Sequence, residues 1–175
     1  MIETLIAPRV MAPKRIEASD ATLKLLNGKI SSAQSEGIEV LVSGGVIARN
    51  GRILLLMRSP KAFFANHWDI PGGKVRPDES FIDGFCREIH EETGLVLTGI
   101  NKFITTFDFL DGHNRHTRQF NFFISTSADK IRIDHNEHSR FEWFSEMDVQ
   151  VIEPNASPET FSTIQAAFHA MKMSE

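Results

Sequence analysis

The segment REIHEETG, residues 87–94, constrains the fold of this chain more than any other stretch. Around it, apolar side chains recur at i, i+3, i+4 and i+7, and these are Ile82, Phe85, Cys86 and Ile89. Such spacing predicts an α-helix with one buried stripe. The helical periodicity begins near Ser80, and Gly94 stands where a C-terminal cap belongs. The segment therefore predicts a helix whose last turns carry a high density of charge.

Three carboxylates lie on this helix: Glu88, Glu91 and Glu92. Like charges at i, i+3 and i+4 repel one another, and the helix dipole disfavours negative charge near a C-terminus. A solvated acidic surface is the simplest interpretation of such a run. A divalent cation would offset both penalties, because Mg²⁺ and Mn²⁺ prefer hard oxygen ligands and also accept phosphate oxygens.

Apolar runs on either side of the helix predict a sheet. The runs IEVLVSGGVIA and RILLLMR flank an Asn50-Gly51 turn signal and predict a hairpin. GINKFITTFDFL and RQFNFFIST predict two more strands, and RFEWFS a short one before a closing helix from about Ser157. Strands outnumber helices and do not alternate strictly with them. This pattern predicts an α+β fold, a mixed sheet with helices packed on its faces.

Composition limits the partners. A net charge of -4 gives no general attraction to nucleic acid or to an anionic membrane, and we expect neither as a partner. A polyphosphate ligand would need local cations. The single cysteine, Cys86, forms no internal disulfide and fits a reducing compartment. The first residues lack the uninterrupted apolar run of a signal peptide, so we expect the protein in the cytoplasm.

The spacing upstream of the acids is specific. Five residues separate Gly73 from Glu79, and seven more separate Glu79 from Arg87-Glu88. This arrangement resembles the signature of the Nudix hydrolase family, GX5EX7REUXEEXGU with U an aliphatic residue, and every fixed position is occupied. The resemblance covers roughly residues 40 to 150, through GGVIARNGRILLLMR, HWDIPGGKV and EHSRFEWFSEMDV.

The resemblance implies an alpha-beta-alpha sandwich around a mixed sheet, the Nudix fold, and hydrolysis of a nucleoside diphosphate linked to another moiety. It implies that Mg²⁺ or Mn²⁺ is the cofactor, bound by the following groups: the carbonyl of Gly73 and the side chains of Glu88, Glu91 and Glu92. Glu79 and Arg87 look like a pair that braces the loop against the helix. Bound metal would neutralise the phosphate oxygens and lower the pKa of the attacking water.

The residue that takes the proton from this water stays open. One candidate for this general base is a glutamate of the Nudix box, the name used here for the signature segment 73–95, and this glutamate is Glu88 or Glu91. Glu137 is another, because EHSRFEW resembles a segment that places a glutamate over the metals in many members of the family. The alternative is that Glu137 is an ordinary acid of a polar loop.

Several upstream residues are candidates for substrate binding. Arg58 and Lys74 could offset phosphate charge, although Arg58 could equally be an ordinary strand-end arginine. Residues 61–80 are expected to form a loop in which Trp68 is exposed. Trp68 and the Phe63-Phe64 pair could stack on a base, whereas aromatics beside a core strand more often belong to the core. Cys86 is expected to pack in the core, and the histidines lack the spacing of a zinc site.

The substrate is narrowed only by elimination. ADP-ribose hydrolases carry a proline after the signature, and the corresponding stretch here, FDFLDGHN, lacks it. Dinucleoside polyphosphate hydrolases are associated with a tyrosine, and this chain contains none. The segment LLLMRSP matches the coenzyme A pattern only faintly. A nucleoside triphosphate remains the leading expectation for the substrate.

Two alternatives belong to other functional classes, a non-hydrolytic sensor and an isomerase. A non-hydrolytic Nudix sensor would not need the intact acids, and an isopentenyl diphosphate isomerase would need an altered box and a dedicated cysteine.

The first 38 residues are outside the resemblance. We expect residues 1–38 to form an N-terminal arm and residues 39–175 to form the hydrolase domain. A short helix could follow Ser19-Asp20 and end at Asn27-Gly28. Apolar residues in MIETLIAPRVM have no evident partner in a fold that starts near residue 40, so we expect a homodimer formed through this arm.

Overall fold

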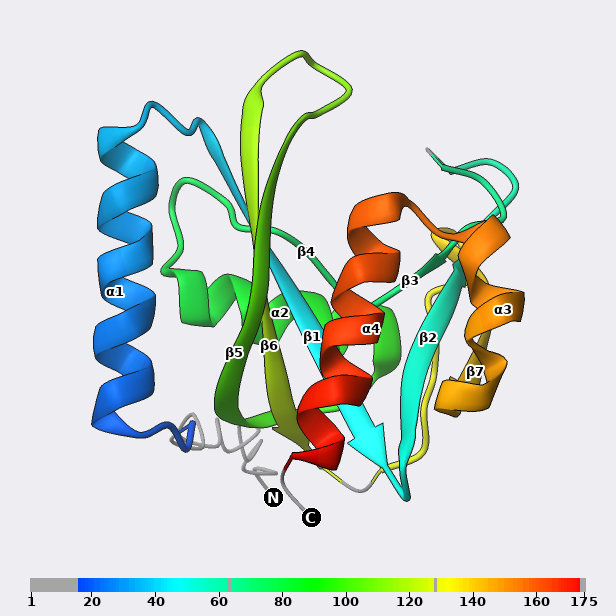
Figure 1. Cartoon of the computed structure of the whole chain (residues 1–175). Coiled ribbons are helices and arrows are strands. Elements are labelled where there is room, and N and C mark those ends of the chain that lie inside the picture. Colours follow the sequence, from blue (N-terminus) through cyan, green and yellow to red (C-terminus); the bar gives the residue numbers. More distant parts are fainter. Residues whose placement is uncertain (1–15, 63, 128, 174–175) are drawn as a thin grey trace, which may run out of the picture.

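Strand β2 (Arg52–Arg58) shows how the layers of this molecule arise. Its apolar residues alternate between two clusters: Ile53, Leu55 and Met57 belong to one, and Leu54 and Leu56 to the other. Successive side chains of a strand point to opposite faces, so an uninterrupted apolar run indicates a strand covered on both sides. The computed structural model describes residues 16–62, 64–127 and 129–173, and in it helices cover both faces of a mixed sheet (Figure 1).

The sheet has seven strands over the described residues, and its central path runs β3-β2-β1-β6-β5. Strand β4 pairs with β1, and β7 pairs with β2. β1 and β6 are parallel, whereas the other pairings are antiparallel. The remaining strand bounds are β1 Val40–Arg49, β3 Trp68–Asp69, β4 Gly72–Lys74, β5 Leu97–Leu110, β6 His116–Thr126 and β7 His138–Phe144. The expected mixed sheet is confirmed.

The Asn50-Gly51 hairpin is also confirmed. β1 and β2 pair with Arg49 opposite Arg52, and both turn residues have positive φ, 50° at Asn50 and 71° at Gly51. Asparagine and glycine tolerate this left-handed conformation, which matches the twist of the two strands. Part of the expected loop at 61–80 is instead strand, because β3 pairs with β2 and β4 pairs with β1.

One helical layer consists of α1 (Asp20–Ser35) and α2 (Phe81–Thr93), and the opposite layer of α3 (Val149–Ile152) and α4 (Pro158–Lys172). Two single 3₁₀ turns, Glu146–Asp148 and Glu153–Asn155, flank α3. α2 begins after Ser80, near the predicted start of the helical periodicity, and ends at Gly94 in the left-handed conformation, as the sequence predicts; the Ser80 side chain caps its first turn. No helix among the described residues combines the length and the apolar character that crossing a membrane would require.

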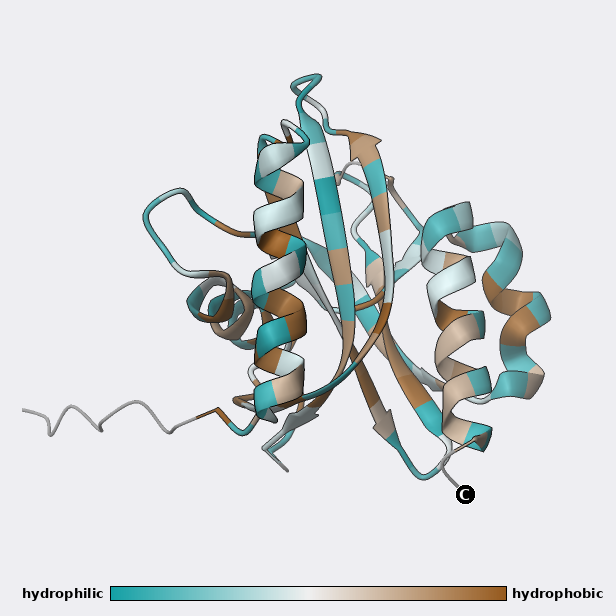
Figure 2. Cartoon of the chain, turned by 60° about the vertical axis from the view of Figure 1, so that its left-hand side comes forward, coloured by the Kyte–Doolittle hydropathy of each residue, from teal (hydrophilic) through white to brown (hydrophobic). Residues whose placement is uncertain are grey.

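The N-terminal helix differs from its expectation. α1 begins after the Ser19 cap as predicted, but it continues through Asn27-Gly28 to Ser35. Leu26 and Ala33, one on each side of that dipeptide, are each 1% exposed in the core beside α2, so tertiary packing outweighs the local preference for a turn. Figure 2 shows α1 alongside the β5–β6 hairpin. Residues 1–15, in which the proposed dimer contact lies, are outside the described residues.

Candidate active site

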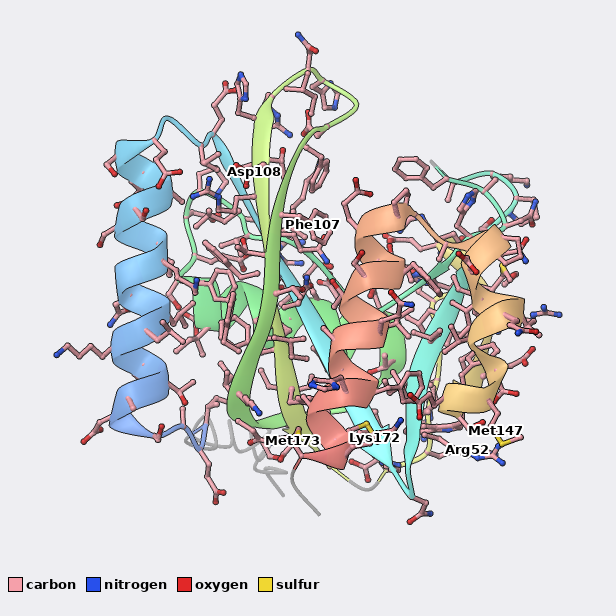
Figure 3. All side chains as sticks on the ribbon, viewed as in Figure 1. Arg52, Phe107, Asp108, Met147, Lys172 and Met173 are labelled. Carbon is pink, nitrogen blue, oxygen red and sulfur yellow. The ribbon has the colours of Figure 1, made fainter. Side chains whose placement is uncertain are left out.

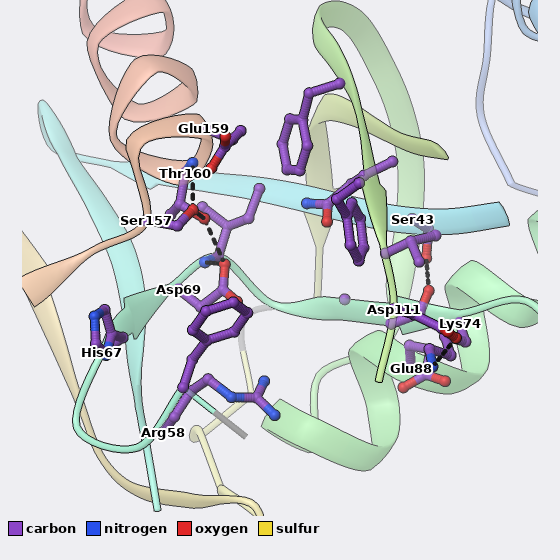
Figure 4. Close-up of a pocket in the computed structure, with 18 of the residues that line it drawn as sticks. Ser43, Arg58, His67, Asp69, Lys74, Glu88, Asp111, Ser157, Glu159 and Thr160 are labelled. Carbon is purple, nitrogen blue, oxygen red and sulfur yellow. Dashed lines mark hydrogen bonds and ion pairs between the residues drawn. The ribbon is translucent and has the colours of Figure 1, made fainter. Parts of the chain in front are cut away.

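A cavity of about 730 Å³ opens where β4, the start of β3, the tip of the β5–β6 hairpin and the N-terminus of α4 meet (Figure 4). Candidate residues from four parts of the sequence line it, namely Arg58, Trp68, Gly73, Lys74, Glu88, Glu92 and Glu137. Arg87, Glu79 and Glu91 do not contribute to its lining. The fold thus brings the acidic helix together with the cations predicted to contact phosphate.

Arg87 lies between the loop and the helix. Its Nε and Nη2 atoms donate to the two carboxylate oxygens of Glu79 at 3.1 and 2.5 Å, and Nη2 also donates to the Lys74 carbonyl at 3.0 Å. Glu79 in turn accepts the backbone N–H of Arg76 at 2.7 Å. The Arg87 guanidinium and this N–H lower the pKa of Glu79 to about 2. Glu79 and Arg87 therefore connect the box loop, residues 73–80, to α2.

The same guanidinium engages two of the three box acids. Its Nη1 donates to Glu88 at 2.6 Å and to Glu91 at 3.0 Å. The Glu91 side chain is 49% exposed and also faces Arg76, with 3.8 Å between charged atoms. Arg87 thus offsets the repulsion that the sequence implies between these acids, and Glu91 points away from the cavity.

Glu92 is in a different environment because it is buried, with 4% of the residue exposed. Its Oε2 accepts the backbone N–H of Gly72 at 2.7 Å, and its Oε1 is 3.7 Å from Nε2 of His138. Burial, and then the charges of Asp69, Glu88 and Glu137, raise the pKa of Glu92 well above its usual value. Burial also raises the pKa of Glu88. The site therefore holds carboxylates that lack sufficient positive charge.

Gly73 is packed directly against this acid pair. A Cβ atom at this position would lie 2.4 Å from Oε2 of Glu88, so any other residue would displace that carboxylate from its place beside the Gly73 backbone. Its carbonyl accepts a bond from Ser43 Oγ at 3.4 Å. A backbone carbonyl and two acids thus face one cavity.

The donor chemistry fits a hard divalent cation. Within the described residues, no three His, Cys, Asp or Glu side chains already stand in metal-binding geometry. The reason is visible in the contacts: Arg87 holds Glu88 and Glu91, while Gly72 holds Glu92. Partly buried carboxylates with raised pKa values beside a carbonyl oxygen, as at Glu88 and Glu92, are nevertheless ligands that Mg²⁺ accepts. Metal binding would therefore require the Arg87 contacts to rearrange.

The aromatic candidates separate clearly. Trp68 is 3% exposed, so its expected exposure is wrong. Its ring packs edge-on against Phe144, with 4.7 Å between centroids, and the Arg140 guanidinium lies over it at 5.1 Å. Phe64 is 54% exposed and lines the cavity, while Phe63 is outside the described residues. The core interpretation therefore fits Trp68, and the stacking interpretation fits Phe64.

Glu137 and His138 enter the site from the loop that leads into β7. Glu137 is exposed at the cavity, close enough for its charge to raise the pKa values of Glu88 and Glu92. His138 is 1% exposed, and its Nδ1 has no hydrogen-bond partner among the described residues. Burial, and then the charge of Arg58, lower the pKa of His138 to about 4, so the ring is neutral near pH 7.

Sequence reasoning missed three acids that line the cavity, namely Asp69, Asp111 and Glu159. Asp69 accepts the Ile70 N–H at 2.9 Å and the Thr160 hydroxyl at 3.2 Å, and burial raises its pKa. Asp111 accepts Lys74 Nζ at 2.8 Å (Figure 4). The only local signal for Asp69 was its place beside the box loop. Lys74 and Asp111 are 37 residues apart, and no spacing rule reveals such a contact.

Known proteins resemble both the sequence and this structure. The family model of the NUDIX domain matches residues 40–165. A CTP pyrophosphohydrolase of Escherichia coli is 43% identical over 61 residues, a match that covers 35% of this chain and 44% of the relative. The Bacillus subtilis protein described as an uncharacterized Nudix hydrolase, YvcI, is 28% identical over 62% of this chain and 68% of its own length. The match to the E. coli relative thus spans less than half of that protein.

Solved structures share the architecture. A MutT NUDIX hydrolase from Burkholderia pseudomallei superposes with a TM-score of 0.62 at 27% identity, covering 73% of this chain and 96% of that one. A MutT protein from Methanosarcina mazei gives 0.63 at 27% identity, with 76% and 94% coverage. The alpha-beta-alpha arrangement implied by the sequence is confirmed by both.

Proposed function

The chain belongs to the NUDIX domain family, and on that premise we propose that it hydrolyses a pyrophosphate bond in a nucleoside diphosphate derivative. A nucleoside triphosphate is the substrate we favour, because the sequence lacks the marks of other subfamilies. Two similar proteins are named CTP pyrophosphohydrolase and 8-oxo-dGTP diphosphatase, which agrees with this choice. The observation that carries the proposal is the shared cavity of Gly73, Glu88, Glu92 and Lys74.

We propose that Mg²⁺ or Mn²⁺ is held by Glu88, Glu92 and the Gly73 carbonyl, with Glu91 joining when it leaves Arg87. When bound, such a cation neutralises phosphate oxygens and activates the attacking water. The raised pKa values of Glu88 and Glu92 support this assignment, because burial disfavours their charged forms and a bound cation would stabilise those forms. Glu79 and Arg87 keep the loop and helix in register while this happens.

Glu137 is our candidate for the general base. Among the glutamates considered, Glu88 and Glu91 are bonded to Arg87, and Glu92 to Gly72. Glu137 is exposed at the cavity and lies within electrostatic range of Glu88 and Glu92. A carboxylate there can take a proton from a water that attacks phosphorus near those acids.

The phosphates and the base of the substrate contact further residues of the cavity. Arg58 and Lys74 line the cavity and offset phosphate charge. Phe64, exposed at the rim, offers a face on which a base can stack. Phosphoryl transfer depends mainly on such positioning and charge stabilisation.

The test is a panel of nucleotides incubated with the protein and Mg²⁺, with pyrophosphate and phosphate release measured. We expect turnover of at least one nucleoside triphosphate and loss of that turnover in EDTA. Tight nucleotide binding without turnover by the unaltered chain would refute the proposal and favour a non-hydrolytic sensor.

Substitutions of Glu137 and Glu92 test the general-base role and the metal-ligand role separately. Glu137→Gln should lower kcat by about 10²–10⁴-fold, the usual contribution of a general base. Glu142→Gln is the matched control, because Glu142 lies on β7, is 48% exposed and pairs with Arg140 away from the cavity lining. Full activity of a Glu92→Gln variant would contradict the metal-ligand assignment.

A further inference from the structure

Asp111 is a buried carboxylate at the tip of the β5–β6 hairpin, with 2% of its side chain exposed. It accepts Lys74 Nζ at 2.8 Å and the Nη2 and Nε of Arg115 at 2.7 and 3.1 Å. The backbone N–H groups of His113 and Arg115 donate to its other oxygen at 2.9 and 3.1 Å. Asp111 is thus surrounded by donors on both oxygens.

These donors come from two different places. Arg115 and His113 belong to the hairpin turn itself, whose backbone is also closed by bonds between Asp111 and Arg115 and between Asn114 and Asp111. Lys74 belongs to β4, outside the hairpin, and lines the same cavity. The turn is therefore complete without Lys74, and the contact from Lys74 serves to link the hairpin to the box loop.

The position of Lys74 makes this link relevant to the site. Lys74 directly follows Gly73, its carbonyl accepts a bond from Arg87, and its side chain is 48% exposed at the cavity. An ammonium group has three donors, so the bond to Asp111 leaves two for a ligand. The long stem would otherwise sample many rotamers, and the bond to Asp111 restricts them.

Charge gives Asp111 a second effect. Lys74, Arg115 and Asp111 together carry a net positive charge at the cavity, since two cations share one carboxylate. Glu88, Glu92 and Glu137 line the same cavity and are competing partners for a free ammonium. Asp111 directs Lys74 toward the hairpin and away from those acids.

We propose that Asp111 is a positioning residue for phosphate recognition: from the hairpin tip it holds the Lys74 ammonium over the cavity, ready to contact the phosphates of the substrate. This inference rests on the proposed function, because it assumes a phosphorylated substrate. Asp111 itself touches no reacting atom. Its effect passes entirely through Lys74.

The test compares steady-state kinetics of Asp111→Asn with those of the unaltered chain, using the best nucleoside triphosphate from the panel. Asparagine keeps an oxygen that can accept the turn N–H groups but loses the charge that holds Lys74. We expect KM to rise on the order of tenfold, the factor that corresponds to about 1.4 kcal/mol, with kcat nearly unchanged. In a Lys74→Gln background, Asp111→Asn should have no further effect on KM.

Asp108→Asn is the matched control. Asp108 lies on the same hairpin and also forms a carboxylate bridge, to Arg118 at 2.6 Å, but it does not line the cavity (Figure 3). It should leave KM and kcat within about twofold of the unaltered values, a difference of roughly 0.4 kcal/mol. Equal KM changes in Asp108→Asn and Asp111→Asn would mean that only the hairpin's stability matters, which would overturn the inference.

Two further outcomes decide the matter. If Asp111→Asn does not fold, as its thermal transition would reveal, Lys74→Gln and Lys74→Arg replace it; an unchanged KM in Lys74→Gln overturns the inference. Lys74→Arg, which can still pair with Asp111, should recover most of the affinity. If the unaltered chain hydrolyses no nucleotide, the proposed function fails; if it does and Asp111→Asn has an unaltered KM, only this inference fails.

Discussion

Replacing Glu92 by glutamine should make the metal-free protein more stable while removing its activity. Glu92 is 4% exposed, and Asp69, Glu88 and Glu137 add negative potential around it. Glutamine has nearly the same shape and keeps an oxygen for the Gly72 N–H. The substitution therefore removes a buried charge without opening a cavity or losing that hydrogen bond.

The size of the effect follows from linkage. A carboxyl whose pKa is raised by folding binds more protons in the folded state, so stability falls as pH rises from the unfolded value of about 4.5 through the raised folded value. One such group changes the unfolding free energy by at most about 1.4 kcal/mol per pH unit within that window. For a chain of this size, each kcal/mol shifts Tm by roughly 2–4 °C.

The assay is thermal unfolding in EDTA between pH 4 and 8, for the unaltered chain and for Glu92→Gln. We expect the two Tm values to converge near pH 4.5 and Glu92→Gln to be higher at pH 8. Mn²⁺ at about 100 times its Kd should add about 3 kcal/mol to the unaltered chain, or roughly 6–12 °C. Glu92→Gln should lose most of that gain.

Glu91→Gln provides the control for this experiment. Glu91 is on the same helix, but its side chain is 49% exposed and bonded to Arg87. Its replacement should show no such stabilisation at pH 8. A Glu92→Gln protein that is less stable than the unaltered chain at pH 8 in EDTA would refute the argument, as would an undiminished Mn²⁺ shift.

Three other predictions follow from the same structure. Glu79, whose pKa the Arg87 bonds lower to about 2, stabilises the fold above pH 4.5 and loses that effect as pH falls toward 2, so Glu79→Gln should flatten an acid-unfolding curve in this range. Phe64→Ala should raise the KM for the nucleotide on the order of tenfold with little change in Tm, whereas Trp68→Ala should lower the unfolding free energy by about 3–5 kcal/mol, measured with urea. Light scattering of the full chain should give a dimer mass, and a monomer mass after removal of residues 1–15, if the apolar N-terminal residues form the proposed contact; a monomeric full chain would exclude it.

Much of the fold could be predicted because its signals are local. The Asn50-Gly51 turn, the helix start near Ser80 and the Gly94 cap each depend on residues within one or two turns of chain, and each lies where the sequence predicts it. The end of α1 could not be predicted in this way. Its continuation past Gly28 depends on Leu26 and Ala33 packing in a core shared with β5, more than 60 residues away.

The site shows the same division between local and distant causes. The spacing of the Nudix box places Glu88, Glu91 and Glu92 on one helix, but it does not predict the hydrogen-bond partner or the exposure of each carboxylate. Arg87 turns Glu91 outward, and Gly72 draws Glu92 inward, so acids that look equivalent in sequence differ from half exposed to buried. Exposure of Trp68 failed as an expectation because its partner, Phe144, is 76 positions further along the chain.

Arg87 resolves how a helix tolerates three acids near its C-terminus. It bonds to Glu79, Glu88 and Glu91, so one guanidinium offsets part of the repulsion among these acids. Glu92 is left without such a partner and keeps a raised pKa. A cation would therefore find one acid available at once, and it would have to compete with Arg87 for the other two. Metal affinity in this chain should accordingly depend on Arg87 as much as on the acids. Because the Glu79 bonds also hold Arg87 in place, we expect that loosening this pair alters both the fold and the proposed metal site.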